Sequence, residues 1–407
     1  MPPKAVLFER SRHEILIEQP WDEACARRAI GAIATAIEED LRAEDFWPSH
    51  PLDEVHQLRT GQKTLYLGAA GVVWAVSYLR GKGAADFRIE AAELIDRIYR
   101  AYLGEPDTGE VVPSYFLGEV GILLVHWRLT KSPRSAAALA AAIEKNRANP
   151  TNEALWGAPG TMVGALHMLG WTEEQRWADL FRSDAEQLLS CWRPSQHAPC
   201  DLWTQDLYGE VVQLIGAGHG FAGNVYPLLR GANLLADGTR ERIYDRCVGS
   251  LRATAVRENG WVNWPPGVGS PRSGRTELLM QWCHGAPGVV TGLSNFPRGH
   301  SSDMEEMLLA AGETIWAAGP LAKGCGLCHG TAGNGYAFLK LHRRTADPLW
   351  LDRARRFAMH AVMQWERALG TYGRGRHSLW TGDLGLAVYL LHCITGADDV
   401  PGLDILD

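Results

Sequence analysis

The sequence predicts an all-α protein folded as a seven-fold α/α toroid, in which seven inner helices form a ring within an outer ring of helices. Two observations predict this fold. A Gly-x-x-Gly frame recurs seven times along the chain, and an apolar run follows each copy. Amphipathic segments separate the copies, while the alternating β-branched runs that are typical of strands are scarce.

The frame repeats at intervals of 39 to 65 residues, about the length of a helical hairpin with its connections. One such frame is typical of a tight loop without function, whereas seven copies indicate an architecture. Glycine at the start of each inner helix lets backbones approach closely where the ring is most crowded. The frames lie at Gly68–Gly71, Gly118–Gly121, Gly157–Gly160, Gly220–Gly223, Gly285–Gly288, Gly330–Gly333 and Gly382–Gly385.

Two kinds of helix are predicted around these frames. Residues 72–79 and 386–391 are apolar on nearly all sides, and a helix with that pattern must be buried. Residues 91–99 instead separate apolar from charged side chains at helical spacing, which predicts an outer layer. The inner helices would leave free N–H groups at one end of the ring. A pocket there would favour anions and collect residues from all seven loops.

We expect one toroid domain over residues 61–407 and an N-terminal helical segment, residues 1–60, that packs on it. A hydrophobic content of 46% with 21% charged residues is typical of a soluble globular protein. The net charge of −7 offers no basic surface, so no nucleic-acid partner is expected. Because neither a signal peptide nor an apolar stretch of about 18 residues occurs, we expect a cytoplasmic protein without an integral membrane segment.

Three consecutive frames carry cysteine or histidine beside their first glycine. Residues 282–288 have the sequence Trp-Cys-His-Gly-Ala-Pro-Gly, and residues 326–333 have Gly-Leu-Cys-His-Gly-Thr-Ala-Gly. His219 stands at the equivalent position of the frame before them. Thiolate and imidazole are ligands that Zn²⁺ prefers, and three protein ligands with one open position are the catalytic form of a zinc site. Since these loops are neighbours in a ring, the sequence predicts a divided zinc site.

At these motifs the chain resembles the LanC-like family, the relatives of lanthionine synthetase C cyclases, over nearly its whole length. Residues 218–223, 263–269 and 378–385 add to the resemblance. The family fold is a seven-fold α/α toroid, which agrees with the fold that the repeat predicts independently.

The resemblance implies one zinc ion per chain, with Cys283, Cys328 and His329 as its ligands. A sulfur nucleophile would take the fourth position, where the metal lowers the pKa of a thiol. Lanthionine cyclases add a peptide cysteine to dehydroalanine or dehydrobutyrine, and LanC-like relatives add glutathione to such residues in proteins. We therefore expect a zinc-dependent enzyme that forms thioether bonds. Glutathione would be its cosubstrate, and its partner a peptide or protein that contains a dehydroamino acid.

The resemblance also implies roles for residues around the metal. His219 matches the cyclase histidine that transfers a proton, a role suited to imidazole. Glu153 stands where the cyclases have a functional aspartate. Lys323 matches a lysine that contacts glutathione, and Arg374 or Arg376 would supply the arginine that the family uses before the last repeat.

Three further positions bear on the details. His284 is expected to support the site through its neighbours, because a fourth protein ligand would close the open position. Cys325 forms a Cys-x-x-Cys with Cys328 where relatives often have an aromatic residue, and it could be a redox partner, a spare ligand or a small side chain. The cyclases tend to carry arginine where this chain has Leu279, which favours the glutathione-using branch.

Three alternatives stay open at this point. A lanthionine-forming peptide cyclase would use the same residues, and so would a non-catalytic scaffold or sensor that binds zinc and glutathione. Toroids of this class also serve glycosidases, which need two carboxylates across a pocket, and Glu119 and Asp383 could form that pair. Acids at helix starts are more often caps, however, and glycoside hydrolysis has no use for the cysteines and histidines.

Overall fold

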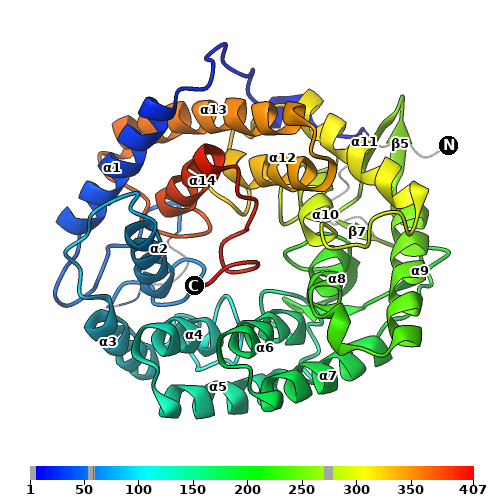
Figure 1. Ribbon diagram of the computed structural model, residues 1–407, viewed down its shortest axis with the longest axis horizontal. Helices are drawn as coiled ribbons and strands as arrows, with labels where there is room; N and C mark the ends of the chain where they lie inside the picture. The colour runs from blue at the N-terminus through cyan, green and yellow to red at the C-terminus, as the bar shows by residue number, and fades with distance from the viewer. Residues whose placement is uncertain (1–5, 54–57, 59, 270–277) are drawn as a thin grey trace.

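Fourteen α-helices form two concentric rings in the computed structural model, which describes residues 6–53, 58, 60–269 and 278–407 (Figure 1). Each inner helix contacts the next one in the chain, and the last contacts the first, so the inner ring is closed. The predicted seven-fold α/α toroid is confirmed. The inner helices are α2 (Ala69–Gly81), α4 (Glu119–Thr130), α6 (Ala158–Thr172), α8 (Phe221–Arg230), α10 (Ala286–Gly292), α12 (Thr331–Thr345) and α14 (Asp383–Thr395).

The outer helices pack on the inner ones, as α7 does on α6 and α13 on α12. The N-terminal helix α1 packs on α14 and α13, so the first helix of the chain completes the outer ring beside the last one. The outer helices are α1 (Glu23–Glu39), α3 (Ala91–Gly104), α5 (Pro133–Asn146), α7 (Gln175–Ser190), α9 (Asp237–Thr254), α11 (Ser302–Ala318) and α13 (Pro348–Tyr372).

The two rings differ in the way that their sequences predict. In α14 every side chain from Asp383 to Cys393 is buried, because this helix is enclosed on all sides. In α3 only one face is buried, and it carries Leu94, Ile95 and Ile98. No described helix combines the length and the apolar character that crossing a membrane requires.

Each glycine frame begins an inner helix, with its first glycine as the N-cap residue. The second glycine lies against the backbone carbonyl of the residue six positions earlier. A methyl group on Gly333 would lie 1.7 Å from the Leu327 oxygen, and one on Gly288 would lie 1.9 Å from the Trp282 oxygen. Glycine therefore lets the preceding loop fold onto the helix N-terminus. In these two frames, the residue that follows the carbonyl is a cysteine.

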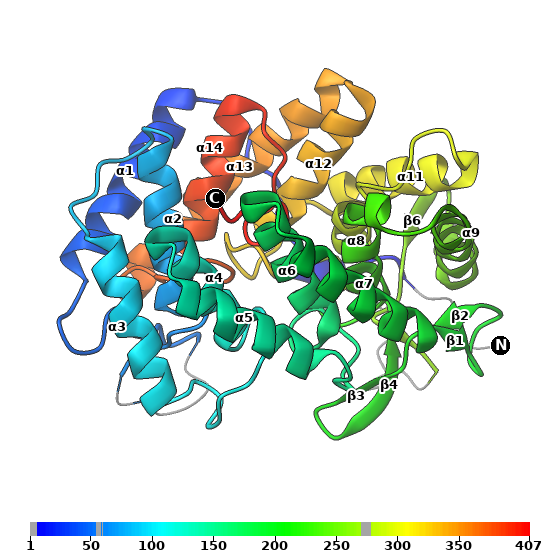
Figure 2. The same ribbon diagram turned by 60° about the horizontal axis from the view of Figure 1, so that its bottom comes forward.

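Short strands occupy the connections between α7 and α8 and between α9 and α10. The hairpin of β3 (Gln205–Leu207) and β4 (Glu210–Leu214) turns at Tyr208 and Gly209, whose φ angles of +55° and +77° are typical of a two-residue type I′ turn. Figure 2 shows this hairpin projecting beyond the helices. The other strands are β1 (Arg193–Pro194), β2 (Asp201–Leu202), β5 (Val256–Glu258), β6 (Trp261–Asn263) and β7 (Gly267–Val268), with β1 paired to β2, β5 to β6 and β7 to β4.

The segment after α14 runs into the centre of the ring (Figure 1). There Asp404 accepts a hydrogen bond from the Tyr226 hydroxyl at 2.8 Å and pairs with the buried Lys340 at 3.0 Å. Asp398 lies 3.0 Å from the same ammonium group. Asp404 thus contacts α8 and α12 beyond their first turns, while Gly402 lies next to Phe116 and Trp380 in the loops before α4 and α14.

Candidate functional site

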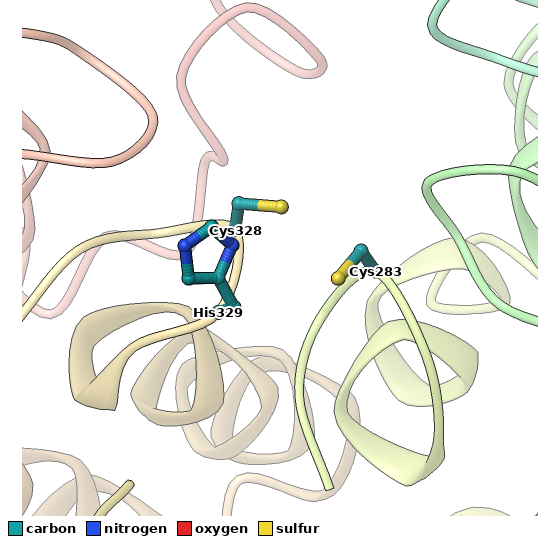
Figure 3. A group of neighbouring side chains, drawn as sticks. All are labelled: Cys283, Cys328 and His329. Carbon is teal, nitrogen blue, oxygen red and sulfur yellow. The ribbon is translucent and has the colours of Figure 1, made fainter. Parts of the chain in front are cut away.

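Cys283, Cys328 and His329 meet in the loops before α10 and α12 (Figure 3). Their two sulfurs and one imidazole nitrogen lie within 4.8 Å of one another. Both cysteines are buried and His329 is half-buried. In Figure 3 the two sulfurs point toward one another across the space between the loops. Two thiolates and an imidazole are a donor set that suits Zn²⁺, so these residues fit the predicted metal.

Backbone hydrogen bonds join this pair of loops to their neighbours. The Cys283 N–H donates to the Cys328 carbonyl at 3.2 Å, and the Cys328 N–H donates to the Trp380 carbonyl at 2.9 Å. The Gly218 N–H donates to the Cys283 carbonyl at 3.3 Å. A methyl group on Gly218 would lie 2.8 Å from the Cys283 Cβ, so glycine permits this approach. Backbone hydrogen bonds thus connect the loops before α8, α10, α12 and α14 at the site.

The side chains of the two cysteines form a hydrogen bond that shifts their pKa values in opposite directions. A hydrogen bond from Cys328 holds the pKa of Cys283 well below its usual range, with further help from His329 and from the charge of His284. The same hydrogen bond, together with burial, raises the pKa of Cys328 well above its usual range. Cys283 is therefore the more readily ionised of the two thiols. A dication at this site would be held by two thiolates.

His219, in the loop before α8, pairs with the fully buried Glu153. The imidazole Nδ1 lies 2.8 Å from Glu153 Oε2. The carboxylate is itself held by the backbone N–H of Leu155, at 3.0 Å, and by that of Trp156. Because a carboxylate only accepts, Nδ1 carries the proton of this hydrogen bond. The His219 ring centroid lies 5.9 Å from that of His284, the residue that follows Cys283.

Other polar residues lie near the two cysteines but outside the group that could hold a metal. This metal-type group, Cys283, Cys328 and His329, contains neither His284 nor Cys325 among the described residues. Cys325 is buried, and burial raises the pKa of its thiol far above the usual range, so it is held as a neutral thiol. Lys323 is exposed, and its charge favours the thiolate form of Cys328.

Both predicted arginines hold the N-terminal segment against the loop before α14. Arg376 forms a two-point ion pair with Asp53, in which Nε lies 2.7 Å from Oδ2. The Thr381 hydroxyl donates to the same carboxylate at 3.0 Å. Arg374 donates to the backbone carbonyls of residues 48 and 49. A ligand carboxylate would have to replace these partners to bind either arginine.

The carboxylates considered for a glycosidase both stand at the start of inner helices. Glu119 begins α4, is half-buried, and hydrogen-bonds with Tyr99. Asp383 begins α14 and accepts the Arg376 N–H at 2.8 Å, and burial raises the pKa of its carboxyl to about 7. Asp383 therefore stabilises the loop at a helix start, as the alternative of a capping role predicts.

Sequence reasoning missed two residues that contact the cysteines. Gln281 Nε2 donates to the Cys283 sulfur at 2.9 Å, and the Tyr66 hydroxyl hydrogen-bonds with Cys328. Burial and the two cysteines raise the pKa of Tyr66 well above its usual range, so its hydroxyl remains a donor. Tyr66 had a signal in the sequence. It stands two residues before the first glycine of its frame, as Cys283 and Cys328 do in theirs.

The molecule is an α/α toroid in which two cysteines and a histidine, a group that could hold a metal ion, lie together before two of the inner helices. The chain belongs to the lanthionine synthetase C-like protein family, whose sequence model matches residues 60–405. The predicted family is therefore confirmed, and this family contains enzymes.

Individual relatives match parts of the chain. Glutathione S-transferase LANCL1 of Danio rerio is 38% identical over 157 residues, which cover 38% of this chain and 36% of that protein. LanC-like protein GCL1 of Arabidopsis thaliana is 37% identical over 150 residues, covering 36% of this chain and 32% of that protein. The matched segments thus span about a third of each relative. The structure of nisin cyclase superposes with a TM-score of 0.61 at 14% identity, over 85% of this chain and 92% of the cyclase, and so shares the fold.

Proposed function

We propose that this chain is a zinc-dependent enzyme that forms thioether bonds by adding glutathione to dehydroalanine or dehydrobutyrine residues in peptides or proteins. The observation that carries the proposal is the convergence of Cys283, Cys328 and His329 next to the loop of His219. Three protein ligands leave a fourth position for a substrate sulfur. The relative named a glutathione S-transferase supports glutathione as the thiol.

When bound, zinc would lower the pKa of the thiol and hold its sulfur as a thiolate at neutral pH. In the addition, a C–S bond forms at the β carbon of the dehydroamino acid and its C=C π bond breaks. The thiol loses one proton and the α carbon gains one, so atoms and charge balance. We assign the transfer to the α carbon to Nε2 of His219, because Glu153 holds the other ring nitrogen.

The surroundings of the site suit an anionic cosubstrate. The exposed ammonium of Lys323 stands in the loop of the second ligand cysteine, where it would pair with a glutathione carboxylate. The N-termini of α10 and α12 add partial positive charge at the same end of the ring. Arg376 would bind a second carboxylate only by exchanging its ion pair with Asp53.

Metal analysis and mass spectrometry test the proposal together. The purified protein should contain about one zinc per chain, and Cys283→Ala or Cys328→Ala should lose it. Cys393→Ala, a change at a buried cysteine in α14, is the matched control and should keep the metal. Incubation with glutathione and a dehydroalanine peptide should give a glutathione adduct that depends on zinc and on His219.

Other outcomes separate the alternatives. A native protein free of metal would refute the zinc site. Glutathione binding without an adduct would indicate a scaffold or sensor. A peptide with both a cysteine and a dehydroamino acid that lost its free thiol without added glutathione would indicate a lanthionine-forming cyclase.

A further inference from the structure

Each of the two ligand cysteines has a hydrogen-bond partner that lies outside the metal-type group. Gln281 Nε2 contacts the sulfur of Cys283 at 2.9 Å, and the Tyr66 hydroxyl contacts Cys328. Both partners are buried, with 6% and 8% of their surface exposed. Each sulfur therefore has a neutral hydrogen-bond donor, and the two donors come from different loops.

Packing fixes where the Tyr66 hydroxyl lies. The phenol ring stacks on Trp380, with centroids 5.9 Å apart and planes 12° from parallel, and its edge meets Phe116. The Tyr66 carbonyl accepts the Trp380 N–H at 3.1 Å, while the Trp380 carbonyl accepts the Cys328 N–H at 2.9 Å. Trp380 thus positions both residues, because its N–H binds the Tyr66 carbonyl and its carbonyl binds the Cys328 N–H.

The amide of Gln281 is oriented by the sulfur itself. The backbone of Gln281 exchanges two hydrogen bonds with that of His284, at 3.0 and 3.1 Å, and so closes the turn that carries Cys283. The buried Gln281 Oε1 has no hydrogen-bond partner among the described residues. A thiolate accepts and does not donate, so the NH₂ group must face the sulfur.

We propose that Tyr66 and Gln281 are positioning residues that hold the two cysteine sulfurs in place as metal ligands and reduce the negative charge on them. This inference rests on the proposed function, whose metal centre it extends. Hydrogen bonds to a charged acceptor are the strong ones, and residues that contact metal ligands orient them and tune the metal. A substrate thiolate would add a third sulfur anion to a buried site, where two donated hydrogen bonds offset part of the excess negative charge.

Cobalt substitution tests this inference without turnover. The variants are Tyr66→Phe and Gln281→Leu, each of which removes one donor. The control is Tyr389→Phe, which removes a buried hydroxyl that donates to the Ala354 carbonyl at 2.7 Å in another part of the ring. We expect the sulfur-to-cobalt charge-transfer band of each test variant to move to longer wavelength, because a thiolate without its donor is easier to oxidise. We also expect metal affinity in a chelator competition to fall about 10- to 100-fold.

The spectrum of the folded, cobalt-loaded protein decides the question even where a variant is less stable. Charge-transfer bands and affinities equal to those of wild type and of Tyr389→Phe would overturn the inference. A wild-type protein that showed the thiolate–cobalt spectrum but formed no glutathione adduct would refute the proposed function and leave the roles of Tyr66 and Gln281 standing.

Discussion

Replacing Glu153 with glutamine removes the charge that holds His219 while keeping the size of the side chain. Glu153 Oε2 accepts from both His219 and the Leu155 N–H, and Oε1 accepts from the Trp156 N–H. An amide has only one oxygen. In either orientation its NH₂ group must face at least one of these donors, so the substitution weakens the contact with His219 or disrupts the loop that holds Glu153.

The size of the expected effect follows from the kind of hydrogen bond that is lost. A hydrogen bond to a charged group contributes about 1.5–3 kcal/mol. At about 1.4 kcal/mol for each factor of ten, the rate of thioether formation should fall roughly 10- to 150-fold if the charge of Glu153 assists proton transfer by His219. Zinc content should not change, because neither residue belongs to the metal-type group.

The assay is the single-turnover rate of glutathione addition to a dehydroalanine peptide, followed by mass spectrometry with zinc content measured on the same sample. Glu119→Gln makes the same chemical change at the start of α4 and should keep the wild-type rate within about twofold. A Glu153→Gln protein that also kept the wild-type rate would refute the reasoning. So would a rate loss that matched a loss of bound zinc, since Glu153 would then act on the structure of the site.

Three further predictions concern stability and binding. Gly333→Ala should cost about 1–3 kcal/mol in denaturant unfolding, because its methyl would lie 1.7 Å from a carbonyl oxygen. Gly170→Ala, with nothing within 4 Å of the added methyl, should be neutral or stabilise by about 0.5–1 kcal/mol, and an equal loss at both sites would contradict the packing argument. Burial lowers the pKa of His392 from 6.5 to about 3. Between pH 3 and pH 6.5 the folded state therefore binds fewer protons than the unfolded state, and the free energy of unfolding falls as the pH drops below 6.5. From pH 7 to 5 this group should cost about 2 kcal/mol, and His392→Gln should lose less over that range. Lys323→Gln should raise KM for glutathione about 1.5- to 5-fold, as expected for an exposed ion pair, and leave KM unchanged for cysteamine, a thiol without a carboxylate.

The fold could be predicted because its main constraint is local and repeated. Each glycine frame must begin a helix whose preceding loop folds back on it, and at Gly288 and Gly333 the structure has no room for a side chain. The apolar runs after the frames fixed which helices are inner. The short strands before α8 and after α9 could not be predicted in this way, because β1, β2 and β7 have two residues each and leave no period to detect.

The convergence of Cys283, Cys328 and His329 could be predicted because the chemistry of cysteine and histidine marks a possible metal site, and both motifs precede adjacent frames. The contacts of Tyr66 could not, because a tyrosine before a glycine frame is an ordinary packing residue. Only closure of the ring brings the loop before α2 next to those of α12 and α14. The ion pair between Arg376 and Asp53 was missed for a similar reason. It joins the N-terminal segment to the last loop, and no sequence spacing encodes that contact.

The arrangement of the site makes its chemistry depend on ring closure. Cys283 and Cys328 precede consecutive frames, but the residue whose carbonyl accepts the Cys328 N–H is Trp380, before the last frame. The hydroxyl that hydrogen-bonds with the Cys328 sulfur belongs to Tyr66, before the first frame. Since the Trp380 N–H also donates to the Tyr66 carbonyl, the contact that closes the ring also positions Cys328. Such a site cannot exist in the unfolded chain, so the free energy of metal binding at these residues would also be free energy of folding.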